Sequence, residues 1–482
     1  MTGPDGAAPL SLDALGTVHL VGVGGAGMSV VARLLAARGV PVQGSDARDS
    51  DTLAALRADG VRVWAGHDAG HVEAADTVVV SSAVRETNPE LAAARAAGLR
   101  VLHRSEALAA LMADGRAVAV AGAHGKTTTS AMLATVLRGA GQDPSFAIGS
   151  SVITADGPVA GGHLGGGDVL VAEADESDGS FLNYAPDVAV VTNVEPDHLD
   201  HYGSREAFER AFVDFAGRIR PGGALVACAD DAGSSALARA HAAHGGATVT
   251  YGTSAGADLR VSDVRPEPGG GVGATIEGAV GGLGVPPSRL RLRVPGHHNA
   301  LNATAAVAVA VLLGVEPDTA VAAALDFLGT GRRFEARGTA AGVRVVDDYA
   351  HHPTEIAALL AAARPVAGGG RLIVLFQPHL YSRTRAFAHE FADALGAADV
   401  VVVTGVYAAR EDPDPTVDAR TVADLVRAGA ATAVEDRLEA ARVVADAARP
   451  GDLVLTVGAG DVTDLGPVVL DRLRAGAGGP DA

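Results

Sequence analysis

The sequence of 482 residues has one cysteine and one tryptophan, and aromatic residues make up only 4% of it. The lone Cys228 has no partner for an internal disulfide, which is typical of a reducing compartment. The first residues lack the basic-then-apolar order of a signal peptide, and no run approaches the ~20 apolar residues of a membrane span. We therefore expect a soluble, cytoplasmic protein.

Positive charge is also scarce, because 38 Lys and Arg residues face 57 Asp and Glu, for a formal net charge of −19. Such a balance repels polyanions, so we expect no nucleic-acid or membrane partner. We further expect a monomer or a weak homodimer. Any anionic ligand must be held locally, by loop amides, helix N-termini and a few placed cations.

Apolar residues, by contrast, make up 48% of the chain. Short β-branched runs alternate with Ala- and Leu-rich segments of helical period, which is typical of α/β proteins with parallel sheets. The length indicates about three domains. We predict a Rossmann-like domain at 1–115, a central P-loop ATPase-type parallel sheet at 116–331 with a β-rich excursion at 252–294, and a second Rossmann-like domain at 332–482.

A glycine-rich loop follows the first predicted strand, in "TVHLVGVGGAGM". Gly22, Gly24 and Gly27 fit G-x-G-x-x-G, and Asp46 follows at the spacing of a ribose-binding acid. The amides of such a loop hold a pyrophosphate whatever nucleoside it carries. The motif alone therefore leaves both an NAD-dependent oxidoreductase and a nucleotide-sugar enzyme open.

A second loop, "VAGAHGKTTTS" at 120–130, contains Lys126, the only lysine of the chain. It keeps the working half of a P-loop, with Thr127 placed to supply a hydroxyl to Mg²⁺, although Val120 stands where the first glycine is usual. We expect Gly122 to take over part of that turn. Arginine does not replace a P-loop lysine, because its planar fork is wider than a compact ammonium. Two nucleotide loops in neighbouring domains indicate an ATP-driven enzyme with a nucleotide-linked substrate.

Motifs along the whole chain resemble those of the Mur ligases of peptidoglycan precursor synthesis: "GVGGAGM", "GAHGKTTT", "VAEADESDGSFL", "TNVEPDHLDHY", "HNALNATAA", "GRRFE", "DDYAHHPTE", "FQPHLYSRT" and "GAGDVT". The resemblance implies ATP-dependent joining of L-alanine to UDP-N-acetylmuramate through an acyl phosphate, with Mg²⁺ or Mn²⁺. It also implies that the first domain binds the UDP-sugar, the second binds ATP, and the third brings the amino acid and closes over ATP.

The absence of a second lysine distinguishes this chain from other members of the family. Sister ligases that add later amino acids generally use a carbamylated lysine after the "DH" motif, and the corresponding segment "REAFERAFVDFAGRIR" has none. A ligase of the same family that attaches a recycled peptide stays open, as does a non-catalytic nucleotide sensor.

The resemblance also implies roles for individual residues. The catalytic candidates are Lys126, His198 and Arg333, and the metal ligands are Thr127, Glu173 and His198. The ATP-binding candidates are Gly122, Ala123, His124, Gly125, Lys126, Thr127, Thr128, Asn299, Asn302 and Asp348. The UDP-sugar candidates are Gly24, Gly25, Ala26, Gly27, Asp46, Ser81 and Ser82, and the amino-acid candidates are Tyr349, His379 and Arg383.

Some positions depart from the family pattern or leave alternatives. Leu380 stands where many relatives have an arginine, which puts one cationic contact in doubt, and Ala123 replaces a more usual threonine. Asn299 and Asn302 fit helix capping as well as adenine binding. The base that deprotonates the incoming amine is not specified; His198, His201, His351 and His352 are all placed in suitable motifs.

Overall fold

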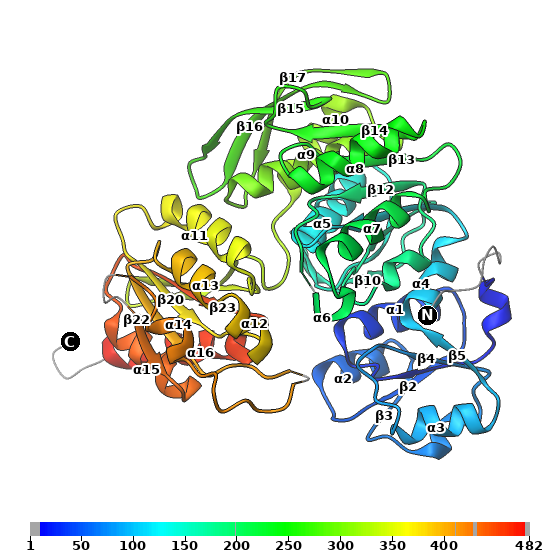
Figure 1. The fold of residues 1–482 in the computed structure, drawn as a ribbon, viewed down its shortest axis with the longest axis horizontal. Coiled ribbons are helices and arrows are strands. Elements are labelled where there is room, and N and C mark those ends of the chain that lie inside the picture. Colours follow the sequence, from blue (N-terminus) through cyan, green and yellow to red (C-terminus); the bar gives the residue numbers. More distant parts are fainter. Residues whose placement is uncertain (1–9, 198, 410, 428–430, 478–482) are drawn as a thin grey trace. The chain divides into compact units, whose positions relative to one another are not determined.

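The computed structural model describes residues 10–197, 199–409, 411–427 and 431–477 (Figure 1). His198, a predicted metal ligand and catalytic residue, lies outside the described residues. The chain forms two compact units. The first contains Met1–Asp263, Ala274–Leu290 and Leu301–Phe327, and the second contains Val264–Gly273, Arg291–Ala300 and Leu328–Ala482.

The first unit begins with a five-stranded parallel sheet in the order β3-β2-β1-β4-β5. Its strands are β1 (Val18–Val21), β2 (Val42–Asp46), β3 (Arg62–Ala65), β4 (Thr77–Val80) and β5 (Arg100–His103). Its helices are α1 (Ala26–Ala37), α2 (Asp51–Ala58), α3 (Pro89–Ala96) and α4 (Arg104–Met112). Buried residues of α1 and α4 join one large apolar core, while α3 contributes to a smaller core with β4. This doubly wound sheet confirms the Rossmann-like prediction.

A ten-stranded sheet follows in the order β10-β7-β11-β6-β12-β13-β14-β15-β16-β17. Its strands are β6 (Arg116–Ala121), β7 (Ser145–Ala147), β10 (Gly162–His163), β11 (Val169–Glu173), β12 (Val188–Val191), β13 (Ala224–Cys228), β14 (Ala247–Gly252), β15 (Leu259–Pro266), β16 (Val272–Val280) and β17 (Leu283–Leu292). A separate hairpin pairs β8 (Val152–Thr154) with β9 (Gly157–Val159). Strands β15 to β17 form the predicted β-rich excursion.

The helices of this region are α5 (Lys126–Gly139), α6 (Leu199–Tyr202), α7 (Arg205–Ala216), α8 (Ala232–Ala243), α9 (His297–Leu312) and α10 (Pro317–Ala323). Strand β6 pairs in parallel with β11 on one side and with β12 on the other. The loop after β6 therefore lies between the carboxyl ends of β11 and β12. Open α/β sheets bind ligands at such a point.

The second unit contains a six-stranded sheet in the order β18-β19-β23-β20-β21-β22. Its strands are β18 (Glu335–Ala340), β19 (Val343–Asp348), β20 (Leu372–Phe376), β21 (Val400–Thr404), β22 (Ala431–Val434) and β23 (Leu453–Val457), and only β18 runs antiparallel to its neighbour. Its helices are α11 (Pro353–Ala367), α12 (Tyr381–Ala386), α13 (Ala388–Leu395), α14 (Arg420–Ala423), α15 (Arg437–Ala447) and α16 (Leu465–Ala477). Helices α11 and α13 pack in one core, and α15 and α16 pack in another, so both faces of the sheet are covered.

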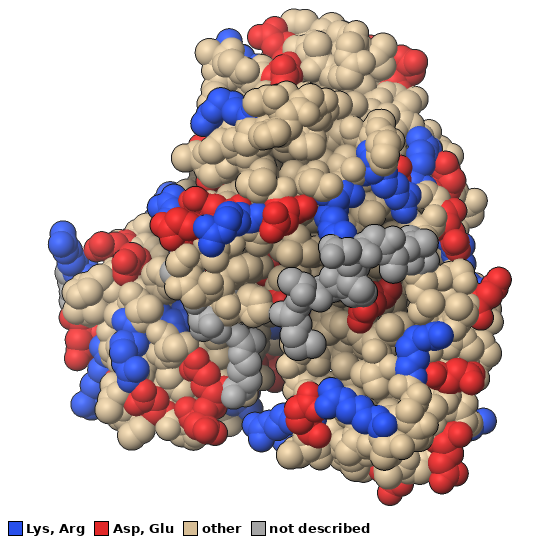
Figure 2. Space-filling view, turned by 45° about the vertical axis from the view of Figure 1, so that its right-hand side comes forward, with Lys and Arg blue, Asp and Glu red and all other residues tan. Residues whose placement is uncertain are grey.

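None of the described helices combines the length and the apolar character that a bilayer crossing requires. On the face shown in Figure 2, acidic and basic side chains are interspersed over the described surface. Cations for an anionic ligand must then come from individually placed side chains.

Candidate active site

The loop between β6 and α5 has the backbone of a phosphate cradle. Gly122 has φ of 131° and Gly125 has φ of 86°, so both occupy the left-handed region that favours glycine. A side chain at position 122 would overlap the Thr192 hydroxyl, and an ideal Cβ at position 125 would lie 3.0 Å from Oδ1 of Asn302. Gly122 thus makes a turn that a residue with a side chain would not fit, and Asn302 lies against the loop.

Lys126 opens helix α5 and its ammonium group is held by several acceptors. Nζ lies 2.8 Å from Oε2 of Glu176 and donates hydrogen bonds to Oε1 of Glu176 at 3.0 Å and to the carbonyl of Gly122 at 2.7 Å. Burial lowers the pKa of Lys126, but the charges of Glu176, Asp175 and Glu173 outweigh this and raise it. Burial raises the pKa of Glu176 to about 7 in spite of the neighbouring ammonium. The lysine is therefore held as a cation against a buried carboxylate.

Two of the three predicted metal ligands are in contact. The Thr127 hydroxyl donates a hydrogen bond of 2.7 Å to Oε1 of Glu173, and the amide of Gly149 donates to Oε2 at 2.8 Å. Thr127 lies in the first turn of α5 and Glu173 ends β11, so the parallel pairing of β6 and β11 brings them together. A hydroxyl and a carboxylate are the hard oxygen donors that Mg²⁺ prefers.

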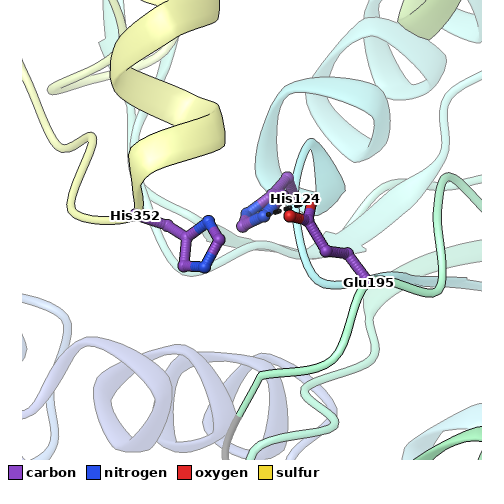
Figure 3. A group of neighbouring side chains, drawn as sticks. All are labelled: His124, Glu195 and His352. Carbon is purple, nitrogen blue, oxygen red and sulfur yellow. Dashed lines mark ion pairs between the residues drawn. The ribbon is translucent and has the colours of Figure 1, made fainter. Parts of the chain in front are cut away.

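The residues that follow β12 clamp the loop from the other side. The amide of Asn193 donates to the carbonyl of His124 at 2.9 Å, and its oxygen accepts from the amide of His124 at 3.0 Å. The Thr192 hydroxyl donates to the same carbonyl at 2.6 Å. The ring of His124 lies 3.3 Å from the carboxylate of Glu195 (Figure 3). Sequence reasoning missed Thr192, Asn193 and Glu195, although the "TN" that ends a predicted strand was a usable signal.

The glycine loop of the first sheet is held by Asp46, which the sequence analysis assigned to the UDP-sugar. Oδ2 of Asp46 accepts a hydrogen bond of 2.9 Å from the amide of Gly24. Gly25 is the N-cap of α1, so Ala26 and Gly27 begin that helix. Ser81 and Ser82 follow β4 at the same edge of the parallel sheet, and the Ser82 hydroxyl donates to Asp178. The structure thus places the UDP-sugar candidates at the carboxyl edge of the N-terminal sheet.

The acidic loop after β11 contacts α4 through Asp175 and the phosphate loop through Glu176. Asp175 accepts a hydrogen bond of 2.6 Å from Nη2 of Arg104, the first residue of α4. Burial alone would raise the pKa of Asp175, but the positive charges of Arg104 and Lys126 hold it below its usual range. The next residue, Glu176, pairs with Lys126. None of these acidic partners was predicted, because a run such as "EADESD" gives no sign of which carboxylates are buried.

In the second unit, the predicted catalytic Arg333 lies over an aromatic ring. Its guanidinium is 5.0 Å from the ring centre of Tyr349, and Nη1 is 3.8 Å from Glu355. The preceding Arg332 lies 4.8 Å over the same ring, donates to the carbonyls of Gly458 and Gly460, and contacts Asp347. Arg332 is thus fully engaged within this unit, and the structure brings Arg333 and Tyr349 together.

Asp348 accepts backbone hydrogen bonds from Phe334 at 2.7 Å and from Ala350 at 2.8 Å. Burial raises its pKa to about 6, in spite of the charge of Arg333. This carboxylate therefore anchors the "GRRFE" segment, in which Arg332 and Phe334 have positive φ values of 57° and 50°. Any role toward a ligand is additional to that anchoring.

Two of the amino-acid candidates, Tyr349 and His379, lie beside His351. The His351 ring is 5.4 Å from that of Tyr349 and 5.8 Å from that of His379. Burial lowers the pKa of His351 to about 3, and the Arg383 charge contributes to this. Leu380, which replaces the more usual arginine, is 8% exposed and has φ of 68°. The apolar side chain is buried, so this position offers no cation.

Asn299 and Asn302 both lie in the first two turns of α9 and are 7% exposed. The amide of Asn299 donates to the carbonyl of Pro295 at 2.6 Å. This contact ties the Asn299 side chain to the segment that precedes α9. Asn302 instead lies against Gly125.

The fold and the site define a nucleotide-dependent α/β enzyme. Its features are a phosphate loop with a lysine, an adjoining hydroxyl–carboxylate pair and a separate glycine loop. Family models match almost the whole chain: the Mur ligase family catalytic domain at residues 17–116, the Mur ligase middle domain at 120–310 and the Mur ligase glutamate ligase domain at 332–460. The chain belongs to the Mur ligase family. The predicted resemblance and the predicted α/β fold class are thereby confirmed.

Three similar proteins share one description. The UDP-N-acetylmuramate–L-alanine ligase of Kineococcus radiotolerans is 60% identical over 479 residues, which cover 98% of this chain and 99% of the relative. The ligase of the same description from Paenarthrobacter aurescens is 54% identical over 465 residues, 96% of this chain and 98% of the relative. The crystal structure of the UDP-N-acetylmuramate–alanine ligase of Thermotoga maritima is 30% identical, with a TM-score of 0.79 and coverage of 95% and 99%.

Proposed function

We propose that the protein joins L-alanine to UDP-N-acetylmuramate and that ATP is converted to ADP and phosphate in the same reaction. The observation that carries this proposal is the position of the only lysine of the chain. Lys126 lies at the end of the phosphate loop, next to the contact between Thr127 and Glu173. Relatives of that activity at 50–60% identity over nearly the full chain support it.

In the first step, a carboxylate oxygen of the sugar substrate attacks the γ-phosphorus of ATP. The bond from that phosphorus to the β,γ-bridging oxygen breaks, and ADP leaves with the electron pair. Two anions meet in this step, so placed positive charge lowers the barrier. Lys126 supplies such a charge at the phosphate loop, and Arg333 is the proposed second cation.

In the second step, the free amine of L-alanine attacks the acyl carbon, the bond from carbon to the phosphate oxygen breaks, and phosphate leaves. The ammonium form must first lose a proton. His351 is a poor base for this purpose, because burial lowers its pKa to about 3. His201, His352 and His198 stay open. Tyr349, His379 and Arg383 are the proposed contacts of the amino acid.

A divalent cation fits the residues present. Thr127 and Glu173 offer an oxygen pair at 2.7 Å, and the proposed third ligand is His198. Bound Mg²⁺ or Mn²⁺ would neutralise phosphate charge at the transferring group. We assign the adenosine part of ATP to Asn299, Asn302 and Asp348, and the phosphates to the loop from Gly122 to Thr128.

The remaining assignments concern the sugar nucleotide and the domain limits. The residues from Gly24 to Gly27, with Asp46, Ser81 and Ser82, are proposed to hold the UDP part. The segments 1–115, 116–331 and 332–482 are proposed as the UDP-sugar, ATP and amino-acid domains.

Phosphate release with each substrate omitted in turn tests the proposal. We expect release only when ATP, UDP-N-acetylmuramate and L-alanine are all present. With ¹⁸O in the sugar carboxylate, we expect one label in the released phosphate, because the acyl phosphate passes that oxygen on. Release without L-alanine, or unlabelled phosphate, would contradict the mechanism.

Two alternative functions are separated by simple assays. A peptide-recycling ligase would accept a tripeptide in place of free L-alanine. An NAD-dependent oxidoreductase would quench nicotinamide fluorescence, and a UDP-sugar would not protect it. We expect no ligation of the tripeptide and no quenching, and we expect a UDP-sugar to protect the protein.

A further inference from the structure

A cavity of about 640 Å³ lies within the second unit. Its walls come from residues 264–272 between β15 and β16, residues 295–297 at the start of α9, Arg344 of β19, and the second half of α11. None of the described residues that line it was assigned to a substrate. The α11 wall begins at residue 361, which is about 9 Å along the helix axis from Glu355. The cavity is therefore separate from the proposed active site, and its volume is in the range of small-molecule pockets.

The wall formed by α11 is open because its side chains are small. It consists of two alanines followed one turn later by a proline and a valine, which are Ala361, Ala362, Pro365 and Val366. Residues four positions apart share one face of a helix, so these side chains form one surface. Pro365 has no amide hydrogen and cannot donate to the carbonyl of Ala361 one turn earlier. The wall thus combines an apolar surface with an acceptor that lacks its usual helical donor.

Proline rings make up much of the remaining apolar surface. The prolines of the lining are Pro266, Pro268, Pro295 and Pro365, and none of the described lining residues is Phe, Tyr or Trp. Proline-rich surfaces pack well against aromatic rings, as the binding of proline-rich peptides in aromatic grooves shows. A ligand with a flat aromatic body therefore complements this lining.

The lining is positively charged, although the chain has a net charge of −19. Arg265 and Arg344 line the cavity, and Glu267 is the one acid among the described lining residues. The Glu267 carboxylate lies 4.0 Å from Arg291, a cation outside the lining. Nη2 of Arg344 donates to the carbonyl of Val366 at 2.8 Å, at the end of α11. No carboxylate of the described residues pairs with Arg344, so the rest of its fork suits an anion.

We propose that this cavity binds a small aromatic molecule that carries one anionic group. Arg344 donates from Nε and Nη1 to the anion, and the proline rings pack against the aromatic body. The carbonyl of Ala361 accepts a hydrogen bond from an N–H or O–H group of the ligand. The inference is independent of the proposed function, because none of these residues takes part in the proposed reaction.

Fluorescence titration of the full-length protein with two dyes tests the proposal. Anilinonaphthalene sulfonate is an aromatic anion, and phenylnaphthylamine has the same rings and N–H group without the sulfonate. For Arg344→Met we expect the affinity for the sulfonate dye to fall about tenfold, because a charge-assisted contact is lost. The affinity for the neutral dye should change less than about twofold. Arg364→Met is the matched control, because Arg364 lies in the same helix and pairs with Asp399 at 2.8 Å, outside the lining.

A second variant tests the cavity itself. Ala361 is exposed at the edge of the cavity, so Ala361→Trp should fold and should weaken the binding of both dyes about tenfold or more by filling the space. Unchanged binding to Ala361→Trp would overturn the site, and so would displacement of the dyes by ATP or UDP-N-acetylmuramate. Equal affinity of wild type and Arg344→Met for the sulfonate dye would overturn the proposed anion contact. Should Arg344→Met not fold, Ala361→Trp decides.

Discussion

At the scale of single residues, the buried pair of Lys126 and Glu176 is the most unusual feature. A buried ion pair contributes little net stability, because desolvation opposes the attraction, but loss of one partner strands a charge. The pair therefore positions the ammonium group before any nucleotide is present. Its geometry depends on a compact charge that also reaches the carbonyl of Gly122.

We predict that Lys126→Arg lowers the turnover number at least ~100-fold, which is the usual effect of removing one preorganised donor from a transition state. The arginine keeps the charge but cannot place it in the same slot. Substrate-dependent phosphate release measures the effect, and thermal unfolding checks the fold. Arg138→Lys, at the exposed end of the same helix α5, is the control and should leave the rate unchanged.

Glu90 forms a second charged cluster, in the N-terminal sheet. Its buried carboxylate lies within 2.5–3.3 Å of Ser45, His71, His67 and His19. Burial alone would raise the pKa of Glu90, but interactions with His19, Ser45 and His71 lower it to about 2. This carboxylate therefore stays ionised far into the acid range.

The lowered pKa of Glu90 makes stability depend on pH with a definite sign. Stability from this group is complete above the ordinary value of 4.5 and is lost as the pH falls toward about 2. The shift corresponds to about 3 kcal/mol of unfolding free energy. We expect Glu90→Gln to lose that dependence in urea unfolding at pH 7, 4.5 and 3. Glu209→Gln, on the exposed face of α7, should retain the wild-type slope.

At the scale of elements, the phosphate loop is held by the segments on either side of it. Because β6 lies between β11 and β12, Glu173 contacts Thr127 and Asn193 clamps His124. The backbone bonds from Asn193 fix the loop without touching Lys126.

We predict that Asn193→Ala raises the KM for ATP several-fold and costs about 1–3 kcal/mol in unfolding free energy, because the backbone amide and the carbonyl of His124 each lose a hydrogen bond with Asn193. The KM for the sugar nucleotide should change little. Steady-state kinetics with each substrate varied distinguish the two effects. An unchanged KM for ATP would show that the loop keeps its shape without this clamp.

The elements also show what the sequence could and could not predict. Glycines, the lysine and the strand-end glutamate were predicted because their chemistry depends on residue type and spacing. The partners Glu176, Asp175, Arg104 and Asn193 were not, because their contacts depend on strand order and burial. Asp46 accepts a hydrogen bond from Gly24, and its role toward a ligand stays a prediction. The spacing was a correct signal of proximity to the loop.

At the scale of the molecule, the reactivity of the single thiol measures whether the first unit is folded. Cys228 ends β13, is 5% exposed, and has a pKa raised by burial. We predict that a maleimide labels native protein far more slowly than protein in denaturant, with a final yield of one label per chain. Saturating ATP and UDP-sugar should slow the labelling further by stabilising the native state. Fast labelling of the native protein would contradict the buried position.

The lone ammonium of Lys126 gives the folded chain an unusual behaviour toward a lysine-specific protease. Such an enzyme can cut only once, after residue 126, and yields one fragment ending at Lys126 and one beginning at Thr127. The bond to be cut lies at the start of α5, and the Lys126 side chain is only 14% exposed. Cleavage therefore requires local opening of the phosphate loop. A single band shift on a gel would then record how often the phosphate loop opens without a nucleotide and how far a nucleotide prevents the opening.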